Sequence, residues 1–147
     1  MSLQSYLARL ASLDAVRPSG QVAPNKDILL LSVIDMIDMG FVKSPELEMS
    51  KVLERVYRVN WQAYAGKDSP FKAQAARTFW ALRREPFCTV RRCDGGRLED
   101  IPLPPTAFML RRCGVQMVLD GELFGLLMDE DTRLRCRNVL KAAYIGL

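Results

Sequence analysis

Arginine is the residue type with the clearest chemistry in this sequence, and it gathers between positions 77 and 97. That stretch holds six arginines against two acidic residues, Glu85 and Asp94. A guanidinium stays charged, and its planar fork donates paired hydrogen bonds to phosphate and to the guanine edge. The stretch therefore predicts a surface that binds an anionic ligand such as DNA. The side chains predicted to contact it are Arg77, Arg83, Arg84, Arg91 and Arg92.

The apolar residues between these arginines support a second interpretation. Residues 79–82 and 87–90 predict two short strands, with a turn at 84–86 and a hairpin turn at Asp94-Gly95-Gly96. Alternate side chains of a strand point to opposite faces, so the arginines would form a solvated face over a core that contains Trp80. The residues by themselves leave both interpretations open.

A second candidate anion site lies at the start of an apolar helix, in the sequence Pro24-Asn25-Lys26-Asp27. Asn25 is a favourable N-cap, and the unpaired backbone N–H groups of a helix N-terminus attract phosphate. Lys26 would add its charge there, and we predict that it contacts DNA. The alternative is a solvated lysine that offsets the charge of Asp27.

Patterns for catalysis and metal binding are weak. The chain has no histidine, which removes most general-base and nucleophile-activation arrangements and the commonest metal ligand. Asp35 and Asp38 share a helix face, where a carboxylate pair can bind a metal, but we interpret them as an exposed helix edge. The cysteines lack a second zinc knuckle, so we predict reduced thiols, some of them buried. They are Cys88, Cys93, Cys113 and Cys136. We predict no enzyme activity, no cofactor and no metal.

Length and composition are those of an ordinary globular domain. The chain has 147 residues, of which 49% are hydrophobic and 26% charged, and its net charge is +4. The sequence contains no apolar run of the roughly 18 residues that a membrane span needs, and its N-terminal segment is amphipathic. We therefore expect no membrane partner and a cytoplasmic location.

The spacing of apolar residues predicts helices alternating with a few strands. Helices are expected over 3–13, from Asn25 to Met39, from Ser50 to about Gly66, over 106–112 and 120–128, and from Asp129 onward. A chain break is expected at 17–20, short extended pieces at 41–42 and 47–49, and a strand at 115–119. The predicted fold is α+β, a single domain (residues 1–147) with helices around a small antiparallel sheet.

The last predicted helix carries both apolar and basic residues. Leu134, Val139 and Leu140 are expected to face the core. The basic residues Arg133, Arg135 and Arg137 follow three acids at 129–131, so we predict local ion pairs on a solvated face.

Three stretches resemble one family. They are APNKDILLLSVIDMI, RTFWALRREPF and VLDGELFGLLMDEDTRLRCRNVLKAAYI. These stretches are similar to the small α+β domains that precede HNH nuclease modules in modification-dependent restriction enzymes. The characterised member of that family is the sulfur-binding domain, which reads phosphorothioate DNA. Asn25, Asp27 and Thr78 stand where the family usually has histidine, proline and proline.

The resemblance implies a recognition pocket beside the basic residues. The positions it implies are Pro24, Asn25, Thr78, Phe79 and Trp80. No HNH segment occurs in these 147 residues, so a nuclease would be a separate subunit or domain. The function expected is non-catalytic binding of double-stranded DNA, with modified DNA such as phosphorothioate as the ligand, in a restriction or defence system. The alternative is a protein–protein interaction module that uses the same arginine and aromatic residues without nucleic acid.

Overall fold

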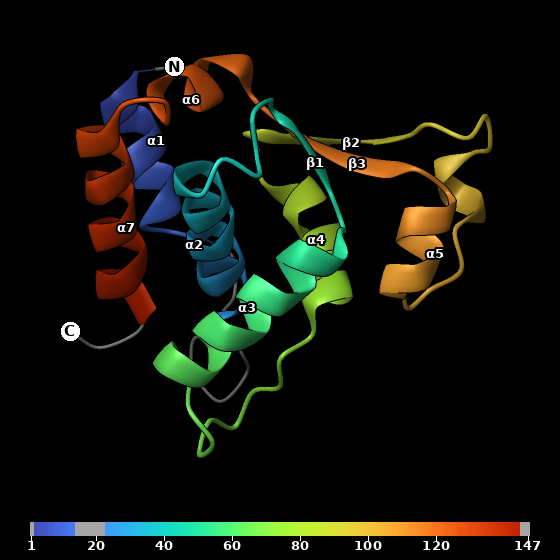
Figure 1. The fold of residues 1–147 in the computed structure, drawn as a ribbon, viewed down its shortest axis with the longest axis horizontal. Coiled ribbons are helices and arrows are strands. Elements are labelled where there is room, and N and C mark those ends of the chain that lie inside the picture. The colour runs from blue at the N-terminus through green and yellow to red at the C-terminus, as the bar shows by residue number, and fades with distance from the viewer. Residues whose placement is uncertain (1, 14–22, 145–147) are drawn as a thin grey trace.

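The computed structural model describes residues 2–13 and 23–144. The chain break predicted at 17–20 lies outside the described residues. Figure 1 shows the arrangement of the elements. In chain order they are α1 (Leu3–Leu10), α2 (Asn25–Asp38), β1 (Glu46–Glu48), α3 (Lys51–Tyr64), α4 (Ala75–Ala81), η1 (Leu82–Arg84), β2 (Cys88–Arg92), η2 (Leu98–Asp100), α5 (Ala107–Arg112), β3 (Val115–Leu119), α6 (Gly121–Leu126) and α7 (Glu130–Tyr144). The predicted α+β class, with helices around a small antiparallel sheet, is confirmed.

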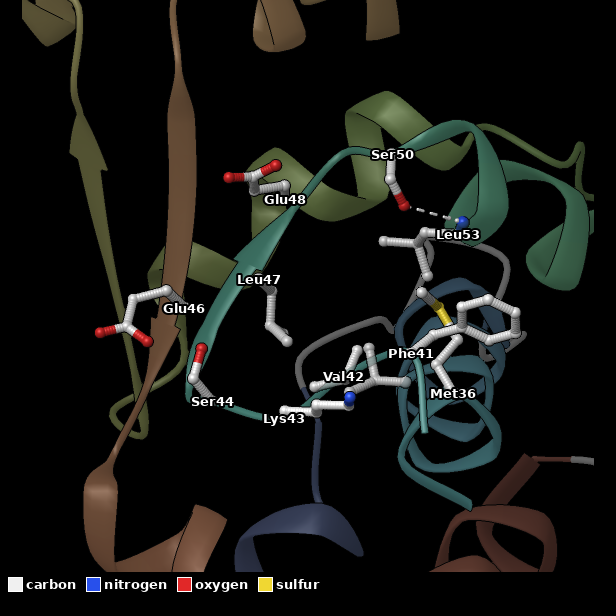
Figure 2. Close-up of a pocket in the computed structure, with 11 residues that line it drawn as sticks. Met36, Phe41, Val42, Lys43, Ser44, Glu46, Leu47, Glu48, Ser50 and Leu53 are labelled. Atoms are coloured by element: carbon white, nitrogen blue, oxygen red, sulfur yellow. Dashed lines mark hydrogen bonds between the residues drawn. The ribbon is translucent and has the colours of Figure 1, made fainter. Parts of the chain in front are cut away.

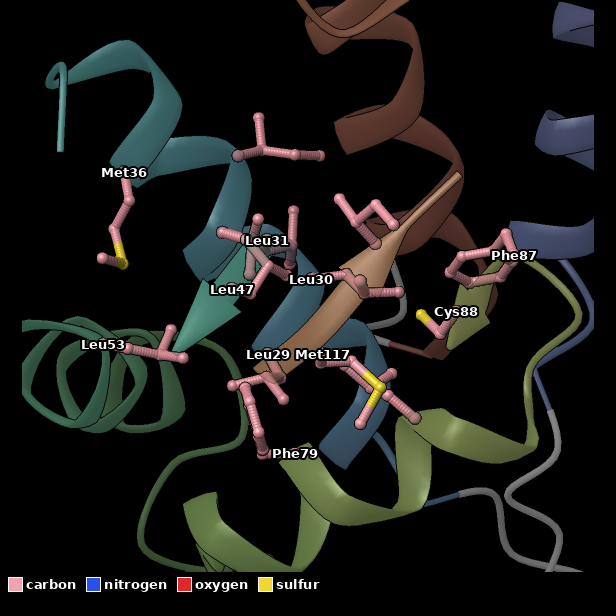
Figure 3. Packing of buried hydrophobic residues seen from close by; sticks show 14 of the residues in the cluster. Leu29, Leu30, Leu31, Met36, Leu47, Leu53, Phe79, Phe87, Cys88 and Met117 are labelled. Atoms are coloured by element: carbon pink, nitrogen blue, oxygen red, sulfur yellow. The ribbon is translucent and has the colours of Figure 1, made fainter. Parts of the chain in front are cut away.

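Helix α2 lies at the centre of the molecule, as its sequence predicts. Ile28 and Leu29 have no exposed surface, and nearly every residue from Lys26 to Met36 is buried. Helices α3, α4 and α7 all pack against it. A helix that is apolar on most faces buries them all only when it is surrounded. Figure 3 shows its leucines meeting side chains from the sheet and from α3 and α4.

The sheet has the order β1-β3-β2, and both pairs are antiparallel. On β3, Val115, Met117 and Leu119 are buried, whereas Gln116 and Val118 keep partial exposure. This alternation places one face of the sheet on the helical core and leaves the other partly open to solvent. The prediction of a strand at 115–119 is therefore confirmed.

The prediction of a strand at 79–82 is wrong, because these residues belong to helix α4 and the 3-10 turn η1. Thr78, Phe79 and Leu82 are the buried residues of this segment, and Leu82 follows the other two at four and three residues, the spacings that share one helix face. The strand predicted at 87–90 is observed as β2, shifted by one residue at its start.

The hairpin predicted at Asp94-Gly95-Gly96 is also not formed. Gly95 has a positive φ of 90°, as a turn requires, but the chain then enters η2 and α5 before returning as β3. Strand β2 pairs with β3 across this long connection. The turn chemistry was recognised correctly, but the following residues do not form the partner strand.

Helix caps are set by local hydrogen bonds at several starts. Ser50 accepts a hydrogen bond from the backbone of Leu53 at 3.1 Å, which begins α3, and Thr106 begins α5 in the same way. Asn25 was predicted to be a cap, but it is the first residue of α2, and Pro24 holds the cap position. The side chain of Asn25 therefore does not cap the helix and can form hydrogen bonds elsewhere.

Ion pairs join α7 to α2, contrary to the prediction of local pairs within α7. Arg133 bonds Asp38 at 2.5 Å, and Arg137 contacts both Asp35 and Asp38. Asn60 of α3 donates to Asp35 as well, at 2.9 Å. Asp38 is exposed, as the interpretation of a helix edge requires, and Asp35 is half-buried, but both carboxylates also attach the last helix.

Two further predictions for single residues have mixed outcomes. Leu134 is 55% exposed and does not face the core, whereas Leu140 is buried as predicted. The cysteines are all free thiols, and each of them except Cys93 is buried. Among the described residues, none of the helices has both the length and the hydropathy needed to cross a membrane.

Candidate nucleic-acid interface

Lys26 does not form the exposed phosphate contact that its position predicts. Its ammonium group is buried and lies 2.7 Å from Oε2 of Glu85, whose side chain is buried as well. This ion pair joins the first turn of α2 to the end of η1. The correction has a physical cause: a buried charge must be paired, and Glu85 is the pairing group.

Asp27 is the neighbouring buried acid, and it has no partner among the described residues. Neither of its carboxylate oxygens accepts a hydrogen bond there, and the residue has no exposed surface. Burial raises the pKa of Asp27 to about 8, and the negative charge of Glu85 acts in the same direction, while its own backbone N–H and the charge of Lys26 partly offset this rise. Asp27 is therefore mainly protonated at neutral pH. The charged groups of this region are Lys26 and Glu85, which pair with each other.

The residues implied as a recognition pocket lie where α2 packs against α4. Pro24, Thr78 and Phe79 are buried in this packing, and only Asn25 and Trp80 keep partial exposure.

Tyr57 of α3 connects this group, although it was not among the predicted site residues. The amide of Asn25 donates to Oη of Tyr57 at 3.3 Å and to the backbone oxygen of Lys72 at 3.0 Å. Burial raises the pKa of Tyr57, while its hydrogen bonds with Thr78 and Asn25 act against this rise. Asn25 thereby takes part in a tertiary contact between α2, α3 and the segment before α4.

Trp80 and Arg83 form a stacked pair at the end of α4. The guanidinium carbon of Arg83 lies 4.7 Å from the centre of the indole ring, and its Nη1 donates to the Trp80 backbone oxygen at 3.0 Å. Partial burial lowers the pKa of Arg83, and the nearby charge of Arg84 adds to this effect. Arg84 is exposed and has no ion pair among the described residues.

Arg91 and Arg92 are satisfied by groups of the protein itself. Arg91 donates to Gln116 at 2.8 Å and lies 3.8 Å from a carboxylate oxygen of Glu46. Arg92 bonds Asp94 at 2.6 Å and donates to the backbone oxygen of Arg97 at 2.8 Å. Of the five arginines predicted to bind DNA, these two are therefore the most occupied by internal contacts.

Arg77 lies at a groove that also contains a cation the sequence prediction missed. The groove has a volume of about 360 Å³ and lies between α3, the start of α4 and the start of α5. Arg58 of α3 and Arg77 of α4 both line it, both are exposed, and neither has an ion pair among the described residues.

The groove contains one acidic residue, and it is already paired. Glu54 lines the groove and forms a close ion pair with Arg111 of α5. Arg111 also donates to the backbone oxygen of Met49 at 3.2 Å, which fixes α5 against the start of α3. The field inside the groove is consequently set by the unpaired guanidinium groups of Arg58 and Arg77.

The sequence prediction missed Arg58, and the pattern that could have identified it is the basic face of α3. Lys51, Arg55 and Arg58 are spaced by four and three residues, so they share one helix face, and all three are exposed. The basic stretch after position 77 drew attention because it is continuous in sequence. The basic face of α3 is also positively charged, but its three members are separated in sequence by residues of other faces of the helix.

A second hollow lies on another part of the surface, beside β1. Its volume is about 180 Å³, and it is lined by residues from the end of α2, β1 and the start of α3. Figure 2 shows Phe41, Met36 and Leu53 on one side of it, with Lys43, Ser44 and Glu46 on the other. Phe41 is 62% exposed, which is unusual for so large an apolar side chain.

No protein-family model matches the chain, and no curated protein sequence is significantly similar to it. Within the part of the chain that the structure describes, no three acidic, cysteine or histidine side chains are grouped as metal ligands. The two surfaces are therefore interpreted from their own geometry.

Proposed function

We propose that this protein is a non-catalytic DNA-binding module, and that double-stranded DNA binds at the groove between α3, α4 and α5. The observation that carries the proposal is the pair of exposed guanidinium groups, Arg58 and Arg77, on one groove whose acid is already paired. Unpaired arginines near a phosphate chain replace bound counterions and form charge-assisted hydrogen bonds. Arg84, exposed at the end of η1, is a further phosphate contact in this proposal.

The proposal extends to modified DNA, with the phosphorothioate linkage as the first candidate. The resemblance of three stretches to the sulfur-binding family supports it, and so does the composition of the groove. The groove wall between the arginines consists mainly of apolar residues. They are Ala73, Ala75, Ala76, Pro105 and Ala107. A sulfur atom is more polarisable than oxygen and loses less hydration beside such groups. A nuclease that acts on the bound DNA would be a separate subunit or domain of a restriction or defence system.

Fluorescence anisotropy with plain, phosphorothioated and base-methylated duplexes of one sequence tests the proposal. We expect affinity to fall steeply with salt. The Arg58→Ala/Arg77→Ala double variant should bind more weakly and reduce the slope of log K against log salt by about 1.8, the value for two phosphate contacts. A preference among the duplexes identifies the modification that is read.

A matched control separates local contacts from the loss of net charge. Arg9 and Arg135 are exposed arginines of α1 and α7, two helices that lie on the opposite side of the molecule from α4 and α5 (Figure 1). The Arg9→Ala/Arg135→Ala double variant removes the same charge and should retain most of the affinity. Equal losses in the two double variants would contradict a binding site at the groove.

A second candidate function is a protein interaction module, and the hollow beside β1 is the observation that favours it. Exposed Phe41 lies next to a hollow of about 180 Å³, at the free edge of β1. An extended peptide that inserts one apolar side chain is the partner that fits a hollow beside a free strand edge. Pull-down at high salt that requires Phe41 and recovers no nucleic acid would favour this function.

A further inference from the structure

Helix α5 and the segment before it place apolar side chains beside the basic groove. Pro105 and Ala107 line the groove itself. Leu103 and Phe108, from the same segment, are 66% and 62% exposed. Arg112 lies one turn after Phe108 on the same face of α5 and is exposed as well. The groove therefore has guanidinium groups in its lining, and the segment that supplies Pro105 and Ala107 to this lining also carries large exposed apolar side chains.

These apolar groups do not match the surface of an intact duplex. Stacked and paired DNA presents phosphates and the edges of bases, while the flat faces of the bases are covered by their neighbours. Aromatic and aliphatic side chains contact base faces where a base is single-stranded, or where a step is opened. The combination of exposed Phe108 and unpaired arginines is therefore complementary to a phosphate chain with an unstacked base.

The size and the polar groups of the groove agree with such a ligand. Its volume of about 360 Å³ lies within the roughly 300–1,000 Å³ of pockets that hold small ligands. A groove of this size holds one nucleotide, so the rest of a bound duplex would lie outside it. Gln74 also lines it and is exposed, and a glutamine amide both donates to and accepts from base edges.

The helix that carries Phe108 is held in a defined position. Thr106 caps α5 through the backbone of Met109 at 3.2 Å. Arg111 ties the same helix to Glu54 and to the backbone of Met49 on the other side of the groove. Phe108 follows the lining residue Ala107 in this helix, so its backbone position relative to the groove is fixed while α5 remains attached.

We propose that the groove takes an unstacked nucleotide, with its phosphate held by Arg58 and Arg77 and its base stacked on Phe108. This inference rests on the proposed DNA-binding function and deepens it: the ligand is DNA with an accessible base, either single-stranded or extruded from a duplex. Arg112, on the same face of α5 as Phe108, contacts the adjoining phosphate.

Three matched DNA ligands test the inference with the whole chain. They are a single strand, its fully paired duplex, and the same duplex with one unpaired 2-aminopurine. Affinity is measured by anisotropy, and stacking by 2-aminopurine fluorescence. We expect tighter binding to the single strand and to the duplex with the unpaired base than to the paired duplex, and a change in fluorescence on binding. Phe108→Ala should weaken binding of the single strand and of the duplex with the unpaired base by about 10-fold, and leave binding of the paired duplex nearly unchanged.

Phe41 supplies the matched control, because it has the same 62% exposure as Phe108 and lies at the separate hollow of Figure 2. Phe41→Ala should leave all three affinities unchanged. Both phenylalanines are exposed, so neither variant should unfold, and circular dichroism checks this.

The outcomes separate the inference from the proposed function. If the paired duplex binds through Arg58 and Arg77 but Phe108→Ala has no effect, the inference is overturned and the DNA-binding function stands. If Phe41→Ala lowers affinity as much as Phe108→Ala, stacking at the groove is overturned as well. Binding to none of the three DNAs overturns both.

Discussion

Asp27 has the most unusual environment of any single residue in the described structure. It is fully buried, its oxygens lack partners among the described residues, and burial together with Glu85 raises its pKa to about 8. A carboxyl group in this state stays neutral in the folded protein at pH values where the unfolded chain has lost the proton. The first turn of α2 therefore contains a proton that is bound by folding.

This proton predicts a pH dependence of stability. The folded pKa of Asp27 lies above its unfolded value of 3.8, so the folded state binds more protons between these values and loses stability as the pH rises. Asp27→Asn removes the titration. Relative to wild type, the variant should gain about 1 kcal/mol per pH unit between pH 5 and pH 8. Urea unfolding at several pH values measures this difference.

An exposed acid provides the control for that experiment. Asp68 lies in the loop before α4 and is exposed, so Asp68→Asn should show the same dependence on pH as the wild type. A constant difference between Asp27→Asn and wild type across this pH range would mean that Asp27 does not hold an extra proton in the folded state.

The fates of the basic residues also differ at this scale. Lys26 forms a buried ion pair with Glu85 and Arg92 an ion pair with Asp94, while Arg83 stacks on Trp80. An acidic partner reduces the charge that Lys26 and Arg92 present to a ligand, because it carries the opposite charge, whereas Trp80 covers one face of the Arg83 guanidinium. Arg77 and Arg84 keep their charge exposed, which is why the proposed interface depends on them and on Arg58.

At the scale of elements, the attachment of α7 to α2 is the arrangement with the clearest energetic consequence. Arg137 and Arg133 of α7 bond Asp38 of α2, and Arg137 reaches Asp35. Partial burial of Asp38 disfavours its charge, but the hydrogen bonds from Arg137 and Arg133 outweigh this effect and lower its pKa. The last helix is thus held by charge pairs in addition to its buried Cys136 and Leu140.

Removal of one arginine from this cluster should destabilise the fold. Arg137→Ala removes the arginine partner of Asp35 and one of the two arginine partners of Asp38. We expect the free energy of unfolding to fall by about 1–2 kcal/mol at pH 7. Because the folded pKa of Asp38 is depressed, the pair contributes above the unfolded value of 3.8 and its contribution fades as the pH falls below it. The loss should therefore shrink in acid, as measured by urea unfolding.

Arg135→Ala is the matched control on the same helix, since Arg135 is exposed and forms no ion pair among the described residues. It should change stability by less than about 0.5 kcal/mol. An equal loss in both variants would show that the cluster contributes nothing beyond the propensity of α7.

At the scale of the whole molecule, one core joins elements from both ends of the sequence. Leu10 of α1, Leu30 of α2, Met117 of β3 and Leu140 of α7 belong to the same buried cluster. Because residues distant in sequence share this cluster, removing any one of these elements would expose the buried side chains of the others. The described part of the chain should therefore unfold as one cooperative unit.

Coincidence of two probes tests this cooperativity. Tryptophan fluorescence reports on α3 and α4 through Trp61 and Trp80, while far-ultraviolet circular dichroism reports on all helices, including α1 and α7. The two urea transitions should have the same midpoint and slope. A separate, earlier loss of helical signal would mean that α1 and α7 detach before the rest.

Much of this architecture is encoded in local patterns. The position of α2 follows from its nearly continuous apolar surface, β3 from strict alternation, and the starts of α3 and α5 from Ser50 and Thr106. The α+β class and the absence of histidine are likewise properties of the sequence. Such features are predictable because they depend on residues close in the chain, whose spacing already determines which side chains share a face.

Tertiary structure decided the rest, and the reason is the choice of partners. Residues 79–82 have apolar side chains that suit either a strand or a helix, and packing against α2 selected the helix. Lys26 looks like a free cation in the sequence, but Glu85, 59 positions away, neutralises it in space. Arg58 and Arg77 have no ion pair within the described residues, because the fold pairs Glu54 with Arg111. The sequence determines which side chains are charged. Whether a charged side chain can bind a ligand depends on which opposite charges the fold brings near it.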